Sequence, residues 1–408
     1  MSSPSKLRQF LGLFLPLYLP AFLYAVSNSL LVPILPKYAE GFQVNYTLIG
    51  VLLAGNAIGM LISDLPSGIV MRHLGQKRSM IIGLVLAGVS SSLLFWAPTI
   101  AWAIFFRLVA GMGNSLHTVS RQFYLAEMTS VGQRGRVIST FGGTFRFGRF
   151  LGPLIGGTVA MMMGLRASFL AYGVICVVAI VIVALYLPKV EQMRVHAPVA
   201  RPKGGLFWHM LRTQYRKLAT AGLGYLFFQI IRSGPVTLIP LYGTFFLHLD
   251  VQTIGMIIGF SSGLDMLLFV PAGFVMDRWG RRYAVITSCL CITTGVAMVS
   301  MASSATLLLA AGLVAGFGNG LGSGTMMTMG ADLSPEVGRS DFLGAWSMVG
   351  DTGTASGPLV TGKLADLMPL PLTAWVIAAG GITAALIFWR LVPETLQKKQ
   401  PASVRVRA

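Results

Sequence analysis

Long apolar segments follow one another along nearly the whole 408-residue chain. A helix needs about 20 predominantly apolar residues to cross a bilayer. Because 54% of the residues are hydrophobic and only 11% are charged, a soluble fold could not bury this apolar surface. We therefore expect an all-α membrane protein with twelve transmembrane helices, near 10–36, 46–70, 79–97, 100–123, 137–161, 167–187, 218–244, 252–275, 283–302, 305–329, 341–363 and 372–391.

Basic residues give the chain a formal net charge of +18, and their placement predicts its orientation. Lys and Arg gather in the connections between segments 2 and 3, 4 and 5, and 8 and 9, whereas the intervening connections are nearly free of them. This is the positive-inside pattern, which places both termini in the cytoplasm. The same placement argues against nucleic-acid binding. We expect a multi-pass protein of the cell (inner) membrane.

One long connection, 188–217, divides the segments six and six. We interpret it as a cytoplasmic linker between an N-terminal half, 1–187, and a C-terminal half, 218–393, with a basic cytoplasmic tail at 394–408. In the seventh segment Gly234 and Pro235 follow Arg232 and predict a helix that is broken near its middle.

The two halves repeat one another at a constant spacing. Gly273 follows Gly68 by 205 residues, and the same offset relates Asn319 to Asn114 and the pair Gly357-Pro358 to an earlier Gly-Pro pair. A single offset that holds over a long stretch indicates an internal duplication. Parallel repeats with a ligand site between them near the midplane are typical of secondary transporters.

Glycines form a stripe in the fifth segment. Gly148, Gly152 and Gly156 recur every four residues and Gly157 follows them. On a helix this spacing lets another helix approach closely, and Pro153 bends the helix. We interpret the stripe as a close-packed seam between the two halves that opens and re-forms during function.

Among the charged residues inside predicted spans we single out seven, because charge there is expensive and indicates function. They are Asp64, Arg107, Arg146, Arg149, Arg232, Asp265 and Asp351. With a rise of about 1.5 Å per residue, Arg146 lies about 15 Å into its span and Asp265 about 18 Å into its own. Both charges therefore lie near the middle of the membrane.

Two loops share a pattern of glycines and charged residues. They are Gly68, Arg72 and Gly75 after the second segment, and Gly273, Asp277, Arg278 and Gly280 after the eighth. Together with the Arg107 motif of the fourth segment, they resemble the signatures of the major facilitator superfamily over nearly the whole chain. The glycine stripe resembles the motif of its drug–proton antiporters. The resemblance implies that Arg107 helps to couple proton movement.

The same resemblance implies which helices face each other across the two halves. Helix 5 would face helix 8, which makes Arg146 and Asp265 the leading pair. Helix 11 would face helix 2, so Asp351 would meet Asp64, and two such carboxylates could not both ionise cheaply without a nearby cation. Arg72 stands where the family has an aspartate that latches the cytoplasmic side, which puts the latch of the first half in doubt.

Two explanations of the intramembrane charges remain open. The charges could be static salt bridges that fix helix register. Alternatively, the arginines form a positive cavity for an anionic or zwitterionic substrate, and Asp265 or Asp351 carries a proton. Asn114 and Asn319 are candidate substrate contacts. Arg149 has no partner that the sequence can name, and we expect it to touch the substrate.

The chain carries no catalytic, nucleotide-binding or metal-binding motif in a plausible setting, so we expect neither an enzyme nor a bound cofactor or metal. We expect a proton-coupled exporter of small amphiphilic or anionic organic molecules. It would work by alternating access, as a monomer in the lipid bilayer. The alternatives are a proton symporter or facilitator that imports an organic anion, and a lipid transporter of the same fold.

Overall fold

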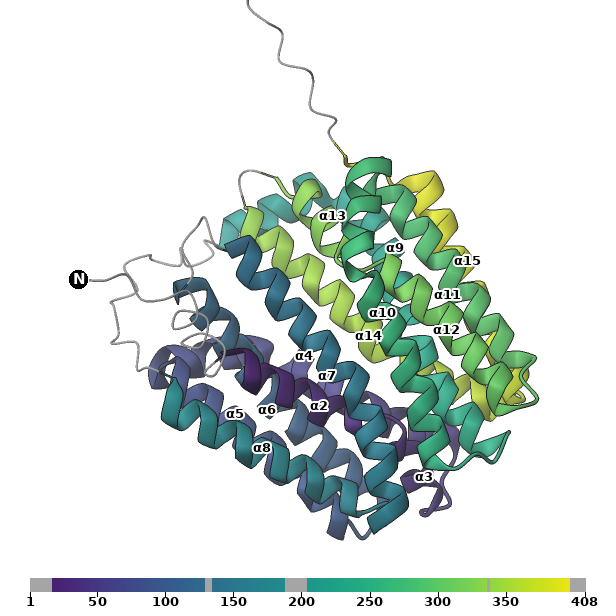
Figure 1. Cartoon of the computed structure of the whole chain (residues 1–408). Helices are drawn as coiled ribbons and strands as arrows, with labels where there is room; N and C mark the ends of the chain where they lie inside the picture. Colours follow the sequence, from purple (N-terminus) through teal and green to yellow (C-terminus); the bar gives the residue numbers. More distant parts are fainter. Residues whose placement is uncertain (1–16, 129–133, 188–203, 336–337, 397–408) are drawn as a thin grey trace, which may run out of the picture.

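The computed structural model describes residues 17–128, 134–187, 204–335 and 338–396 (Figure 1). The secondary structure assigned within these ranges is helical. The start of the predicted first segment, most of the predicted linker (188–203) and the tail beyond 396 lie outside the described residues.

The described N-terminal half contains α2 (Leu19–Leu30), α3 (Ile34–Glu40), α4 (Tyr46–Leu74), α5 (Gln76–Leu93), α6 (Ile100–Met128), α7 (Arg134–Met163) and α8 (Ala167–Tyr186). The predicted first span is two helices, α2 and α3, separated by a turn that ends at Pro33. A proline has no N–H to continue a helix, which explains the interruption.

The described C-terminal half contains α9 (Gly204–Phe245), α10 (Val251–Trp279), α11 (Arg281–Ser300), α12 (Ala305–Leu321), α13 (Thr325–Leu333), α14 (Arg339–Leu367) and α15 (Leu370–Leu391). The prediction of a broken seventh helix is wrong, because α9 continues through Pro235. Near this proline, the hydroxyls of Ser233 and Thr237 donate to the backbone carbonyls of Gln229 and Ser233. Helix α9 also begins inside the predicted linker.

Within the described residues, eight helical segments are long and apolar enough to cross a membrane. The other long helices, α6, α7, α9 and α14, each carry charge at positions that the sequence places inside a span. Their lower hydropathy therefore comes in part from the same residues that make them candidates for the functional site.

The same set of helix contacts occurs in each half (Figure 1). In the N-terminal half α4 packs on α6, α5 on α6 and α8, and α2 on α7 and α8. In the C-terminal half α10 packs on α12, α11 on α12 and α15, and α9 on α14 and α15. The two halves meet mainly through α7 against α10 and α4 against α14.

The halves touch closely at one end of these helices, which we call the closed end. Gly50 packs on the Pro358 carbonyl, and Gly157 packs on α10. A Cβ on Gly157 would lie 2.9 Å from the Cα of Gln252, closer than side chains tolerate. Glycine at these positions lets the backbones of the two halves approach one another.

A carboxylate also ties the halves together at the closed end. Asp366, near the end of α14, accepts hydrogen bonds from the backbone N–H groups of Tyr46 at 2.8 Å and Thr47 at 2.9 Å, and from the Thr47 hydroxyl. These backbone donors lie at the start of α4 in the other half. Asp366 therefore caps a helix across the interface, where the helix dipole also favours negative charge.

The opposite end, which carries the basic loops and is called the basic end here, is open. Nothing approaches within 4 Å of a Cβ placed on Gly68 or Gly273. Leu65 is 80% exposed and Phe274 74% exposed, although both are large apolar residues on helices that meet the other half further along. The halves therefore diverge towards the basic end.

The glycine stripe of α7 does not lie in the seam between the halves, so that interpretation is wrong. Gly148, Gly152 and Gly156 pack on the backbone of α2 in the same half. A different face of α7 meets the other half, where Gly157 contacts α10 and the Pro153 carbonyl meets Gly255. Small residues thus serve an internal contact and an interdomain contact on different faces of one helix.

The interdomain cap generates a prediction. Asp366→Ala removes hydrogen bonds that exist only while the closed end is closed, and we expect it to shift the protein towards a state open at that end by about 1 kcal/mol. Distances between spin labels at Met162 and Leu372 measure the shift, because both exposed residues lie at this end in different halves.

Asp250→Ala is the matched control. Asp250 caps α10 through the backbone N–H and hydroxyl of Thr253, within a single half. Its loss weakens a cap but no interdomain contact, so the label distance should stay as in the wild type. Equal shifts in both variants would contradict a role for Asp366 in holding the closed end.

Candidate functional site

An ion pair joins the two halves midway along α7 and α10. Arg146 on α7 and Asp265 on α10 are 3.2 Å apart, from Nη1 to Oδ1, and both are largely buried. The other terminal nitrogen of Arg146 donates to the Ser323 hydroxyl, and the guanidinium lies 4.4 Å from the centre of the Phe269 ring. The predicted pairing of Arg146 with Asp265 is therefore present in the structure.

Asn319 on α12 connects this pair to a second arginine. Its Nδ2 donates to Oδ2 of Asp265 at 3.0 Å, and its Oδ1 accepts from Nε of Arg232 at 2.5 Å. Asp265 is thus held by Arg146 and Asn319 together, while Arg232 is oriented through the amide. The site is a network in which a change of charge on Asp265 alters the surroundings of both arginines.

A cavity of about 30 Å³ lies beside this network. Arg149, Arg232, Asp265 and Asn319 line it together with apolar residues of α9, α10 and α11. Arg149 forms no hydrogen bond or ion pair with any described residue, and it lies close enough to Arg146 and Arg232 for their charges to interact. With three arginines and one aspartate, the cluster carries an excess of positive charge.

The repeat-related asparagine of the other half forms a neutral network. Nδ2 of Asn114 donates to Oδ1 of Asn28 at 2.9 Å and to Oδ1 of Asn56 at 2.7 Å. Asn114 and Asn319 therefore occupy corresponding positions, but amides surround the first and charges surround the second. Asn114 holds helices α2, α4 and α6 together, which makes its present role structural.

The two carboxylates expected at the contact of α4 with α14 do interact. Asp351 and Asp64 are close enough to repel each other electrostatically, and Asp64 accepts a hydrogen bond of 2.5 Å from the Ser115 hydroxyl. Neither carboxylate forms an ion pair with a described residue. This pair is separate from the network around Asp265.

Arg107 does not join the central network. It is buried in α6, with its Cβ against Gly55 of α4 and its Nε without an acceptor among the described residues. The structure also reveals Arg121, which the sequence analysis missed. It is buried on the same helix, beside the rings of Tyr24 and Phe141 at 5.5 and 4.6 Å. Arg121 follows Asn114 by seven residues, about two helical turns, so the sequence could have placed both residues on the same face of the helix.

Ser323 was missed as well. It lies in the interruption between α12 and α13, where Gly324 adopts a positive φ of 77°. The interruption turns the buried Ser323 hydroxyl towards Arg146 across the interface. Because helical periodicity does not hold through such a break, the sequence pattern could not place this side chain.

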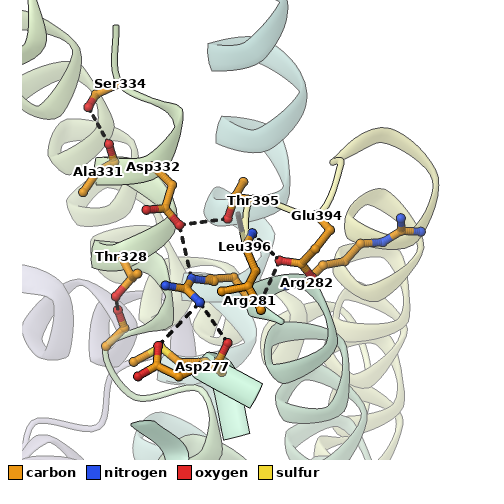
Figure 2. A network of polar contacts seen from close by, with 12 residues as sticks. Asp277, Arg281, Arg282, Thr328, Ala331, Asp332, Ser334, Glu394, Thr395 and Leu396 are labelled. Carbon is orange, nitrogen blue, oxygen red and sulfur yellow. Dashed lines mark hydrogen bonds and ion pairs between the residues drawn. The ribbon is translucent and has the colours of Figure 1, made fainter. Parts of the chain in front are cut away.

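The basic loop of the C-terminal half is tied into a polar network (Figure 2). Arg281 lies 3.5 Å from Asp277 and donates to Asp332 at 3.2 Å. Glu394, beyond the last helix, accepts from the backbone N–H groups of Arg281 and Arg282, and so caps the start of α11. Gly280 needs its glycine, because its φ is 110°.

The corresponding loop of the N-terminal half differs. Gly75 keeps a similar turn, with φ of 81°, but Arg72 replaces the aspartate and donates to the Gly68 carbonyl at 3.3 Å. Lys77 still secures the end of α8 through the carbonyls of Ala184 and Leu187. Among the residues that the structure describes, the loop is therefore anchored through backbone carbonyls.

The ion pair generates a prediction about stability. Arg146→Gln or Asp265→Asn leaves the other charge buried without its partner, and we expect each to destabilise the protein by about 3 kcal/mol. The double variant should lose much less than the sum. Thermal unfolding of the purified protein measures all three, and Arg149→Gln is the control because its side chain has no bond to a described residue to lose. Strictly additive losses would contradict the pairing.

Comparison with known proteins agrees with this architecture. A family model described as Major Facilitator Superfamily matches residues 17–264 and 221–407. An uncharacterized transporter of the MFS type from Methanocaldococcus jannaschii is 20% identical over 83% of this chain and 87% of its own length. The multidrug efflux protein YfmO of Bacillus subtilis is 24% identical over 82% and 81%, respectively.

A solved structure has the same fold. The nucleoside transporter NupG, in a point-mutant form, superimposes with a TM-score of 0.78 at 16% identity, covering 94% of this chain and 100% of that one. The efflux proteins among the relatives agree with the resemblance to drug–proton antiporters. The chain belongs to the major facilitator superfamily.

Proposed function

We propose that this protein is a proton-coupled secondary transporter of the inner membrane that exports small amphiphilic or anionic organic molecules. Its twelve membrane helices would form two pseudo-symmetric six-helix halves, an arrangement supported by the helix contacts that occur once in each half. Export is supported by relatives named as efflux proteins. The two halves would rock against each other around the central site, as in alternating access.

The contacts between the halves suggest which state is present. The closed end holds Asp366 against the start of α4, whereas the halves diverge at the end that carries the basic loops. The positive-inside pattern assigns basic loops to the cytoplasm. We infer an inward-open state, in which the cavity beside Asp265 is reached from the cytoplasm.

The ion pair between Arg146 and Asp265 carries this proposal, because it spans the two bodies that must move. Protonation of Asp265 removes the negative charge that holds Arg146, and it weakens the contact between α7 and α10. Substrate and proton thereby act on one interdomain contact. A ligand shifts such an equilibrium only by its differential affinity for the two states, and this contact would differ between them.

A second candidate is a symporter that imports an organic anion together with a proton. The excess of arginine over carboxylate at the cavity favours it. An anion bound next to Asp265 makes the ionised form of Asp265 less favourable, so anion and proton would bind together and travel in the same direction. Antiport requires the opposite, namely that each ligand displaces the other.

Transport in vesicles tests the proposal. Inside-out vesicles that contain the protein should accumulate an exported compound from a substrate panel only when the lumen is acidic, because protons then leave as substrate enters. We expect Asp265→Asn to abolish this dependence on the pH gradient while downhill exchange continues. The accumulation of labelled compound with and without an ionophore is the measurement.

Other outcomes separate the alternatives. Uptake of an organic anion into right-side-out vesicles, driven by an acidic exterior, would favour the symporter. Exchange that is insensitive to the gradient in the wild type would overturn proton coupling for both candidates.

A further inference from the structure

The central site contains cationic groups that the described part of the protein does not use. Arg149 lines the cavity without a hydrogen bond or ion pair to any described residue, and the charges it interacts with are those of Arg146 and Arg232. Like charges so placed repel one another in a medium of low dielectric constant. The arrangement therefore favours a negative partner that comes from outside the chain.

Arg232 presents a second free edge to the same cavity. Its Nε is engaged by Asn319, which fixes the plane of the guanidinium, while its terminal nitrogens have no acceptor among the described residues. The carboxylate that lines the cavity, Asp265, already accepts hydrogen bonds from Arg146 and Asn319. Two guanidinium edges are thus available, and a planar fork of this kind matches a carboxylate with two parallel bonds.

The cavity also limits the size of the anionic group. A bound water needs about 10–15 Å³ of such space. The 30 Å³ available here therefore holds about two to three water-sized groups, which is enough for the two oxygens of a carboxylate. Apolar side chains line the same cavity, namely Pro235, Val236, Ile239, Ile258 and Ile292, so the body of a larger molecule must lie outside it.

We propose that this cavity binds the carboxylate head of an amphiphilic organic anion. Arg149 is the anchor, the free edge of Arg232 is the second donor, and the body of the molecule lies outside the cavity, where the halves diverge towards the basic end. The proposal rests on the proposed function, since it names the substrate class of the same site, and of the two candidates it accords with the symporter, in which anion and proton bind together. It assigns Arg149 a direct contact with substrate, which sets it apart from Arg146, an arginine already held by Asp265.

Equilibrium binding to the purified full-length protein tests the proposal without any gradient. The probes are 2-naphthoate and its shape-matched neutral and cationic relatives, 2-naphthamide and 2-naphthamidine, with acetate as the head group alone. We expect calorimetry to show binding of 2-naphthoate in preference to the amide and the amidine. Acetate should bind at least about tenfold more weakly, because it lacks the apolar body.

Substitutions at single arginines test where 2-naphthoate binds. Arg149→Gln should weaken binding of 2-naphthoate by about 10- to 100-fold, as expected for the loss of charge-assisted hydrogen bonds. Arg149→Lys should be intermediate, since it keeps the charge but not the fork. Arg166→Gln is the matched control, because Arg166 belongs to the same half but lies outside the cavity and bonds to the Phe95 carbonyl.

Several results would overturn the carboxylate site. They are equal binding of the amide or amidine, equal binding of acetate, no binding of 2-naphthoate at millimolar concentration, and unchanged affinity in Arg149→Gln. Failure of proton coupling would leave these binding results intact. The two proposals can therefore fail independently.

Discussion

A buried ion pair between the two halves organises this protein. Arg146 and Asp265 belong to different halves, and each takes its partner from the other. Removing two charges from water is expensive, and their attraction repays the cost only when further hydrogen bonds complete the geometry. Ser323 and Asn319 supply those bonds. The contact is consequently sensitive to any ligand or proton that changes one charge.

The duplicated architecture has diverged in its chemistry. Asn114 and Asn319 stand at equivalent positions, but the first ties amides together and the second ties Asp265 to Arg232. The loops differ in the same way, because the carboxylate network of the C-terminal half has no counterpart among the described residues around Arg72. One half is therefore mainly a scaffold at these positions, while the other concentrates the groups that can respond to charge.

The closed end and the centre of the interface are held by different forces. At the closed end glycines bring backbones together and Asp366 caps a helix of the opposite half. Such contacts are short-ranged and are lost when the bodies separate. At the centre the ion pair acts over a longer range and in a drier environment. Alternating access would need this difference, because the ends must open in turn while the centre continues to respond to the bound ligand.

The sequence by itself determined the helical membrane fold, and it predicts the repeat and the orientation, because apolar length, charge placement and a constant offset are one-dimensional properties. It also predicted the pairing of Arg146 with Asp265, through depth and family resemblance. The tertiary structure decided which face each helix turns towards its neighbours and where helical periodicity is interrupted. The stripe of Gly148, Gly152 and Gly156 turned towards α2, and α9 continued through Pro235. Ser323 reached Arg146 only because α12 is interrupted, and no linear pattern records the direction of a side chain beyond such a break.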